Sequence, residues 1–295
     1  MDDYYKEIKN ELIQNEIIQR VKDYSKNKNN LQTYYNVGKI LSEAGKHYGE
    51  GIIKKYSIRL TNEFGRGYNI TALKRMRQFY LILRKGAPFA HQLSWSHYME
   101  LLPIKDINKI NYYINISVNN NLSRNDLRKR IKSNEYERLD SETKQKLIKH
   151  EEINIIDNVK NPIVIYNKNN YEEISEKVLQ KIILEDINSF LLELGDGYSY
   201  VSNEYKIRIG DTYNYIDLLL FNIKYNCYVV IELKVTELKK EHIGQIQVYM
   251  NYIDNNIKEI NHNKTIGIII CKKDNKYIIE YCSDKRIISR EYVLI

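Results

Sequence analysis

The chain has 295 residues, of which 43% are hydrophobic, and 46 Lys and Arg outnumber 38 Asp and Glu for a formal net charge of +8. This length can form two domains, each with its own core. No apolar run approaches a membrane span, and the first residues lack the basic-then-apolar order of a secretion signal, so the sequence predicts a cytoplasmic protein with no membrane partner. Three cysteines without Cys-x-x-Cys spacing predict neither disulfides nor a zinc site.

The charge is unevenly distributed along the chain. Residues 1–160 hold 29 Lys and Arg against 19 Asp and Glu, whereas the remaining residues hold 17 against 19. Codon bias that inflates Lys is the alternative explanation, but such bias would not spare one half of the chain. The basic half therefore predicts a polyanionic partner, most simply nucleic acid.

The first half of the sequence has helical periodicity throughout. Residues 4–24 and 31–62 predict helices, with glycines dividing the second of them. Another helix begins near Ile70, and Ser123 is a plausible cap for a helix that continues to Leu139. We therefore expect a helical domain over residues 1–153, in which the single Trp is a core or interface anchor.

Two of these helices carry clusters of basic and amide side chains. One cluster lies on the exposed faces of the helix that begins near Ile70. The other lies on the helix after Ser123, where its members are four residues apart on one side. Either helix is suited to lie along phosphates, although a solvated basic face is the ordinary alternative. The candidate nucleic-acid-binding residues are Lys74, Arg75, Arg77, Gln78, Arg124, Arg128 and Lys132.

The second half alternates helix and strand. Residues 154–170 contain Asn161-Pro162 and an Asn- and Lys-rich stretch, which we interpret as a linker to a domain over residues 171–295. A helix over 171–194 precedes strands near 198–209, 213–221, 227–234 and 264–272, with a helix over 239–254 between the last two. This order predicts an antiparallel meander, a crossover helix and a returning strand.

Three charged residues interrupt the apolar strands of this domain. Asp217 lies in the second strand, and Glu232 and Lys234 lie on one face of the third, because side chains alternate along a strand. A hairpin through residues 222–226 would bring all three together, and a buried charge is costly without a partner or a metal. Mg²⁺ prefers carboxylate oxygens and activates bound water, and an ammonium can stabilise phosphate charge. Solvated charges at strand ends are the alternative.

The helix expected over 239–254 carries a second candidate group. Gln245 and Tyr249 are four residues apart and therefore share one face, beside an apolar stripe that would pack on the sheet. The alternative is that Gln245 is a surface residue and that Tyr249 only packs. Their position directly after Glu232 and Lys234 favours a role at the same site.

These residues resemble a known nuclease pattern. The Asp, the Glu-x-Lys and the Gln-x-x-x-Tyr are similar to the signature of the PD-(D/E)XK nuclease superfamily, and longer runs resemble the bacterial YhcG family, also described as DUF1016. The runs that carry this resemblance are residues 35–39, 74–80, 92–98, 136–139, 190–195, 213–221, 230–234, 266–272 and 279–281.

The resemblance implies a mixed α+β and α/β chain. An N-terminal all-helical, helix-turn-helix-like domain that binds DNA would precede a restriction-endonuclease-like mixed sheet flanked by helices. It also implies a third carboxylate from the helix over 171–194, with Glu176 as the candidate and Glu172, Glu173 and Glu185 as alternatives. The sequence lacks the Pro that precedes the Asp in the superfamily pattern.

Together these features predict a metal-dependent DNA endonuclease that uses Mg²⁺, with Mn²⁺ as a substitute. Asp217, Glu232 and Glu176 would hold the metal, Lys234 would assist the attacking water, and Gln245 and Tyr249 would position the phosphate. The alternatives are a non-catalytic DNA-binding or complex-forming protein, and a nuclease for RNA or branched DNA. Defence, recombination or repair, and mobile-element biology are all open, as is a homodimer.

Overall fold

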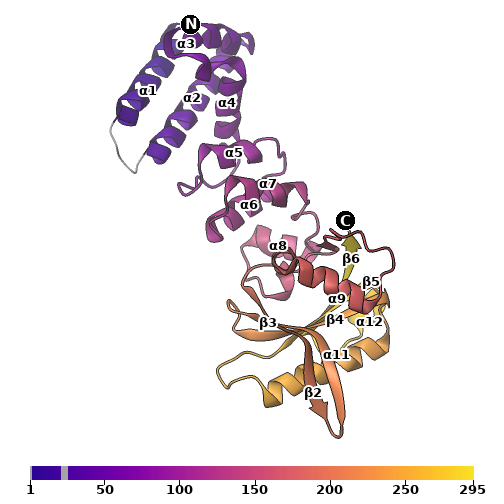
Figure 1. Cartoon of the computed structure of the whole chain (residues 1–295). Helices are drawn as coiled ribbons and strands as arrows, with labels where there is room; N and C mark the ends of the chain where they lie inside the picture. Colours follow the sequence, from indigo (N-terminus) through magenta and orange to yellow (C-terminus); the bar gives the residue numbers. More distant parts are fainter. Residues whose placement is uncertain (1, 21–25) are drawn as a thin grey trace. The chain divides into compact units, whose positions relative to one another are not determined.

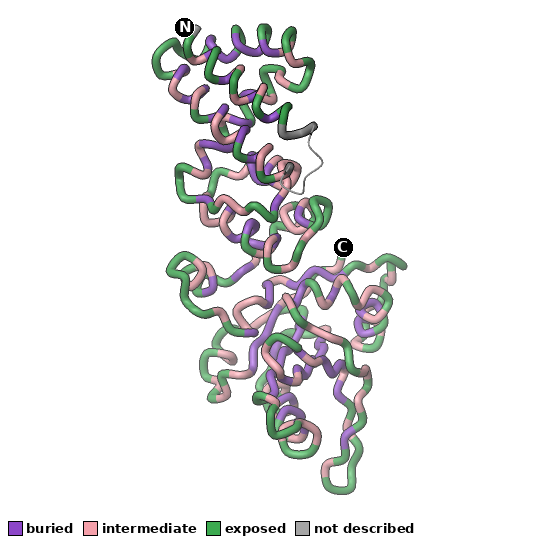
Figure 2. The backbone as a smooth tube through the Cα atoms, turned by 90° about the vertical axis from the view of Figure 1, so that its left-hand side faces the viewer, coloured by how far each residue is buried: buried purple, intermediate pink, exposed green. Residues whose placement is uncertain are grey.

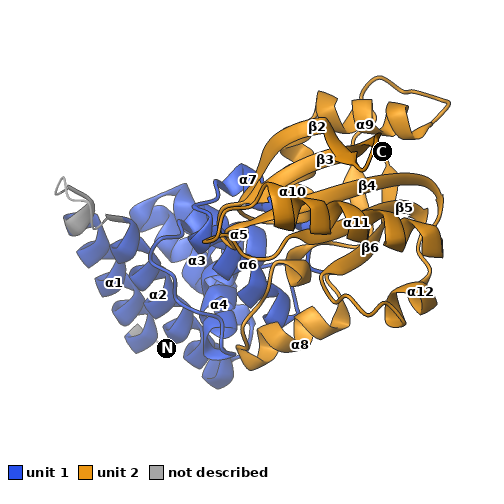
Figure 3. Cartoon of the chain, turned by 90° about the horizontal axis from the view of Figure 1, so that it is seen from below, with its two compact units in different colours: residues 1–136 blue, residues 137–295 orange. Residues whose placement is uncertain are grey.

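The computed structural model describes residues 2–20 and 26–295. The chain divides into two compact units, residues 1–136 and 137–295 (Figure 3). Among the helices of these residues, none combines the length and the apolar character that a membrane crossing requires.

The first unit is helical, as the sequence predicts. Its α-helices are α1 (Asp2–Arg20), α2 (Lys26–Tyr48), α3 (Gly51–Phe64), α4 (Ile70–Arg84), α5 (Trp95–Leu101), α6 (Ile107–Asn119) and α7 (Arg124–Lys132). Positions 21–24 of the first predicted helix lie outside the described residues. Trp95 packs against Tyr34 and Phe79, with ring centroids 4.8 and 5.4 Å away, so it anchors the core of this unit.

The second unit is built on a six-stranded mixed sheet (Figure 1). The strands are β1 (Ile163–Ile165), β2 (Tyr198–Ile209), β3 (Thr212–Asn222), β4 (Cys227–Glu237), β5 (Ile266–Lys273) and β6 (Ile287–Leu294), in the order β1-β6-β5-β4-β3-β2. Strands β2, β3 and β4 form the predicted antiparallel meander, and β5 returns parallel to β4. The helices are α8 (Ser141–Lys149), α9 (Glu176–Glu185), α10 (Ile187–Leu194), α11 (Lys240–Asn256) and α12 (Lys276–Glu280).

Helices cover both faces of this sheet. On one face, Ile182 of α9 and Phe190 of α10 belong to a core with Leu233 of β4 and its neighbours. On the other face, Ile246 and Met250 of α11 share a core with residues of β2 to β6. The predicted apolar stripe of the helix over 239–254 is thereby confirmed.

The structure differs from the sequence predictions at the boundary between the two units. The division falls after Tyr136, before the predicted position, and α8 belongs to the second unit. The predicted linker over 154–170 contains β1, whose Ile163 pairs with Tyr292 of β6 in parallel. Three apolar residues after a Pro are too few to give a readable strand pattern. The helix predicted over 171–194 begins only at Glu176 and breaks at Asp186, which caps α10.

A glycine sets the distance between two helices of the first unit. A Cβ added at Gly38 of α2 would lie 2.2 Å from the carbonyl oxygen of Met76 in α4, so only glycine permits this approach. In contrast, a Cβ at Gly45 of the same helix would meet its nearest atoms, in the Arg77 guanidinium, at 3.8 Å.

We predict that Gly38→Ala lowers the free energy of unfolding by about 1–3 kcal/mol, because the helices must separate. Gly45→Ala is the matched control, since it should leave stability unchanged or raise it by up to ~1 kcal/mol through better helix propensity. Urea unfolding followed by circular dichroism measures both. Equal effects of the two substitutions would contradict this account of the helix contact.

Candidate active site

Strands β3 and β4 separate at the position of the predicted carboxylates. Their backbone pairing runs from Asn222 with Cys227 to Leu218 with Ile231. Beyond that point the Leu233 N–H donates to the side-chain Oδ2 of Asp217 at 2.7 Å. The Asp217 carboxylate thus takes the place of a ladder acceptor and holds the opening between the strands in a fixed geometry.

Glu232 and Lys234 lie together beside this opening, as predicted. The Lys234 Nζ is 3.4 Å from Glu232 Oε2 and 3.5 Å from Glu176 Oε2 at the start of α9. Glu232 is only 1% exposed, and its other oxygen, Oε1, is buried without a hydrogen-bond partner. Leu233, between them, packs into the core on the opposite face. The structure therefore brings together four of the candidate residues: Asp217, Glu232, Lys234 and Glu176.

Burial shifts the acid–base behaviour of this group. Desolvation raises the pKa of Glu232 to about 8, and the nearby Asp217 charge adds to the effect. Burial also raises the pKa of Asp217, against the opposing hydrogen bond from Leu233. Burial alone would lower the pKa of Lys234, but the carboxylates of Glu232, Glu176 and Asp217 raise it above the ordinary lysine value.

Gln245 and Tyr249 of α11 approach the same site. The Gln245 Nε2 donates to the Tyr249 hydroxyl at 3.1 Å, and burial raises the pKa of this hydroxyl, with smaller contributions from the charges of Glu232 and Asp217. His242, one turn earlier, has its pKa lowered by burial and then by the Lys234 charge. The His242 ring also accepts a hydrogen bond from the Lys239 N–H at 3.1 Å, which holds it at the start of α11.

A pocket of about 490 Å³ opens beside Asp217 and is lined partly by residues that the sequence did not predict. Gln180, one helical turn after Glu176, donates to the Asp217 carbonyl oxygen at 2.8 Å. Its four-residue spacing from Glu176 places both side chains on one face of the helix, and this spacing could have predicted its place at the site. Glu204 of β2 is held at φ +46° in a left-handed conformation that sequence periodicity does not indicate. The pocket is lined by Glu176, Lys177, Gln180, Glu204, Tyr215 and Asp217.

The carboxylate oxygens of this site suit a divalent cation. Within residues 2–20 and 26–295, no cluster of three or more His, Cys, Asp or Glu side chains is already positioned to hold a metal ion. The Lys234 ammonium lies close to both Glu232 and Glu176. However, the unpartnered Oε1 of Glu232 is a buried acceptor without a donor. Mg²⁺ commonly uses only one or two protein carboxylates and completes its shell with water and phosphate, so Asp217 and Glu232 suffice chemically.

The predicted nucleic-acid-binding residues of the first unit lie in two settings. Arg124 and Arg128 both contact Glu100, each at 2.7 Å, and the hydrogen bond from Arg128 is the main reason that the pKa of Glu100 falls to about 2. Arg77 pairs with Glu50, and Gln78 donates to the Leu102 carbonyl. The three other candidates have exposed side chains: Lys74, Arg75 and Lys132.

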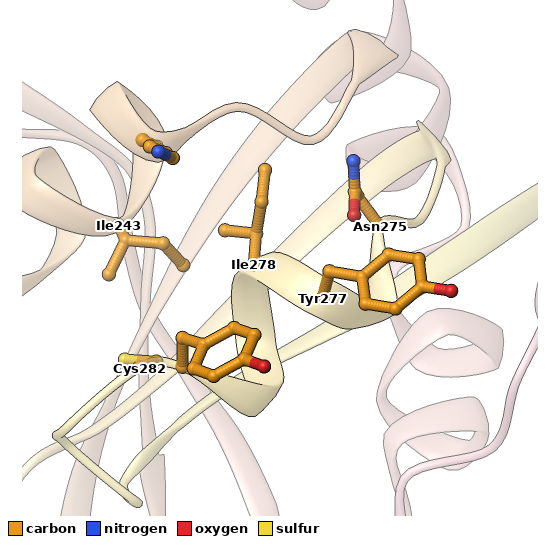
Figure 4. Close-up of a pocket in the computed structure, with 7 residues that line it drawn as sticks. Ile243, Asn275, Tyr277, Ile278 and Cys282 are labelled. Carbon is orange, nitrogen blue, oxygen red and sulfur yellow. The ribbon is translucent and has the colours of Figure 1, made fainter.

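A larger pocket of about 720 Å³ lies between the first turn of α11 and α12 (Figure 4). Its lining contains no carboxylate and therefore offers no ligand set for a hard cation. We assign it no part in the candidate active site. The lining residues are Lys240, Ile243, Asn275, Tyr277, Ile278, Tyr281 and Cys282.

Comparison with known proteins accounts for both units. Residues 157–294 match the family described as the YhcG PDDEXK nuclease domain, and residues 8–138 match the DUF1016 N-terminal domain. The chain is also 25% identical over 283 residues to a protein of Escherichia coli K12 named "Putative nuclease YhcG", covering 81% of this chain and 76% of that protein. The chain belongs to the YhcG family. Its C-terminal domain is a nuclease domain of the PD-(D/E)XK type.

Two solved structures resemble part of this YhcG-family chain. One is a repair endonuclease from Pyrococcus abyssi, with 20% identity and a TM-score of 0.30. The other is a complex of EndoMS with double-stranded DNA, with 19% identity and a TM-score of 0.29. Each match covers 43% of this chain and 48% of the other, so the chain spans about half the length of either structure.

We predict that the metal-free domain loses stability as the pH rises from about 4.5 to about 8. In the unfolded chain, Glu232 loses its proton near pH 4.5. In the folded domain, it keeps its proton until the pH passes its raised pKa. The folded state therefore binds more protons than the unfolded state, and its stability falls as the pH rises between these two values. Glu232→Gln should flatten the dependence. Thermal unfolding in EDTA across this range measures it, with the exposed Glu172→Gln as control. Parallel profiles for wild type and Glu232→Gln would contradict the prediction.

Proposed function

We propose that this YhcG-family protein is a metal-dependent DNA endonuclease that uses Mg²⁺. The observation that carries the proposal is the buried, unpartnered Glu232 oxygen beside Asp217 and Lys234 in a PD-(D/E)XK nuclease domain. Members of this superfamily generally use divalent metals. Asp217 and Glu232 would hold the cation, with Glu176 as a third carboxylate at the margin of the site.

The residues around this position have separate tasks in phosphodiester hydrolysis. When bound, a divalent cation supplies a water of lowered pKa and neutralises phosphate charge. Lys234, whose raised pKa keeps it protonated, would donate to a phosphate oxygen and stabilise the charge that develops there. Gln245 and Tyr249, already joined by a hydrogen bond, would orient the substrate strand.

The helical unit would hold the nucleic acid. Its charge excess and its exposed Lys74, Arg75 and Lys132 suit phosphate contacts, which give affinity without sequence preference. Arg124 and Arg128 are fixed on Glu100 and would offer their remaining donors in a set geometry. Defence, recombination or repair, and mobile-element biology are the settings in which such an enzyme would act.

We predict that Lys234→Met lowers the rate of supercoiled-plasmid nicking at least ~100-fold in Mg²⁺ or Mn²⁺, because transition-state charge loses its ammonium partner. Lys285→Met, at an exposed lysine of the same unit, is the control and should cut at the wild-type rate. EDTA should abolish cleavage by the wild-type protein. The endonuclease proposal fails if the wild-type protein leaves the plasmid intact with both metals, or if Lys234→Met cuts at full rate.

A further inference from the structure

The β2–β3 hairpin extends beyond the sheet next to the candidate active site. Strand β3 pairs with β4 only as far as Leu218, whereas its pairing with β2 continues from Ile216 with Tyr205 to Thr212 with Ile209. Figure 2 shows this hairpin extending from the rest of its unit to an exposed turn. The segment from Glu204 to Asp217 is therefore a two-stranded ribbon that ends at the candidate carboxylates.

The two faces of this ribbon differ in character. On one face, the buried Ile207 and Ile216 belong to the core that includes α11, so the ribbon is anchored in the domain. On the other face, Tyr213 and Tyr215 remain 56% and 51% exposed. The structure thus exposes two large aromatic rings to water on a ribbon that is anchored in the domain.

One basic side chain contacts one of these rings, and a second lies near the turn. Lys206 is paired with Tyr215 across the strands, and its ammonium lies 3.8 Å from the centre of the Tyr213 ring. Arg208 is paired with Tyr213 and contacts Asp211 at 3.3 Å near the turn. Exposed aromatic rings alternating with cations are typical of surfaces that stack unpaired bases and track their phosphates.

The row leads directly to the candidate carboxylates. Tyr215 lines the 490 Å³ pocket together with Asp217 and Glu176, and Tyr213 is the next residue on the same face of β3, about 7 Å further along. A strand lying on the two rings would therefore enter the pocket at Asp217. A duplex offers no exposed base faces to such rings, so the surface suits an unpaired strand.

We propose that the exposed face of the β2–β3 ribbon is a binding platform for single-stranded DNA, in which Tyr213 and Tyr215 stack unpaired bases and Lys206 contacts a phosphate. This inference rests on the proposed function and specifies its substrate: a strand that is unpaired beside the scissile bond.

Binding of a fluorescent deoxythymidine homopolymer, measured by anisotropy in EDTA, tests this proposal without cleavage. Tyr213→Ala and Tyr215→Ala should each weaken binding about tenfold. Tyr215→Phe should bind as wild type, because stacking needs the ring and not the hydroxyl. Lys206→Gln should reduce the salt dependence of binding by about 0.7 in log–log slope, as expected for one lost phosphate contact.

Tyr281→Ala is the matched control, because Tyr281 is an exposed tyrosine of the same unit that lies on the other pocket. A blunt duplex of equal length should bind the ribbon variants and the wild type equally. Unchanged homopolymer binding by Tyr213→Ala and Tyr215→Ala, or an equal loss for the duplex, would overturn the proposal. The endonuclease proposal is judged separately by plasmid nicking, so the two can fail independently.

Discussion

The hydrogen bond from the Leu233 N–H to the Asp217 carboxylate is the contact on which the site depends. It occurs where β3 leaves β4, and it satisfies a buried donor that would otherwise lack its ladder partner. Because the carboxylate makes this bond with one oxygen, its position relative to the next residues of β4 is fixed. Glu232 and Lys234 are thereby held at a defined distance from Asp217 on rigid strands rather than on loops.

Charged side chains are buried away from water where β3 and β4 separate. A buried polar atom without a partner costs about 1–3 kcal/mol, and more when it is charged, so the Glu232 oxygen is a local destabilising feature. The apolar cores on both faces of the sheet stabilise the domain and offset this cost. Lys234 offsets part of the negative charge through Glu232 and Glu176. Such concentrated desolvation is typical of a functional site.

The sequence predicted most of the nuclease fold, because β2 to β5 and α11 have strong apolar periodicity. It missed β1, which has only three residues, and β6, which alternates less clearly because Ser289 and Arg290 are buried within it. The proximity of Asp217, Glu232 and Lys234 followed from strand alternation and from the hairpin expected through residues 222–226. The roles of Gln180 and Glu204 did not, because one bonds a backbone carbonyl and the other depends on an unusual backbone angle.

Binding of Mn²⁺, followed by electron paramagnetic resonance, is the decisive measurement of whether the unpartnered Glu232 oxygen is a metal ligand. If it is, the affinity of the wild-type protein for Mn²⁺ should increase as the pH rises toward about 8, where Glu232 loses its proton. Glu232→Gln should bind Mn²⁺ at least ~10-fold more weakly and without this pH dependence. Equal affinity and equal pH profiles for the two proteins would show that Glu232 does not bind the metal.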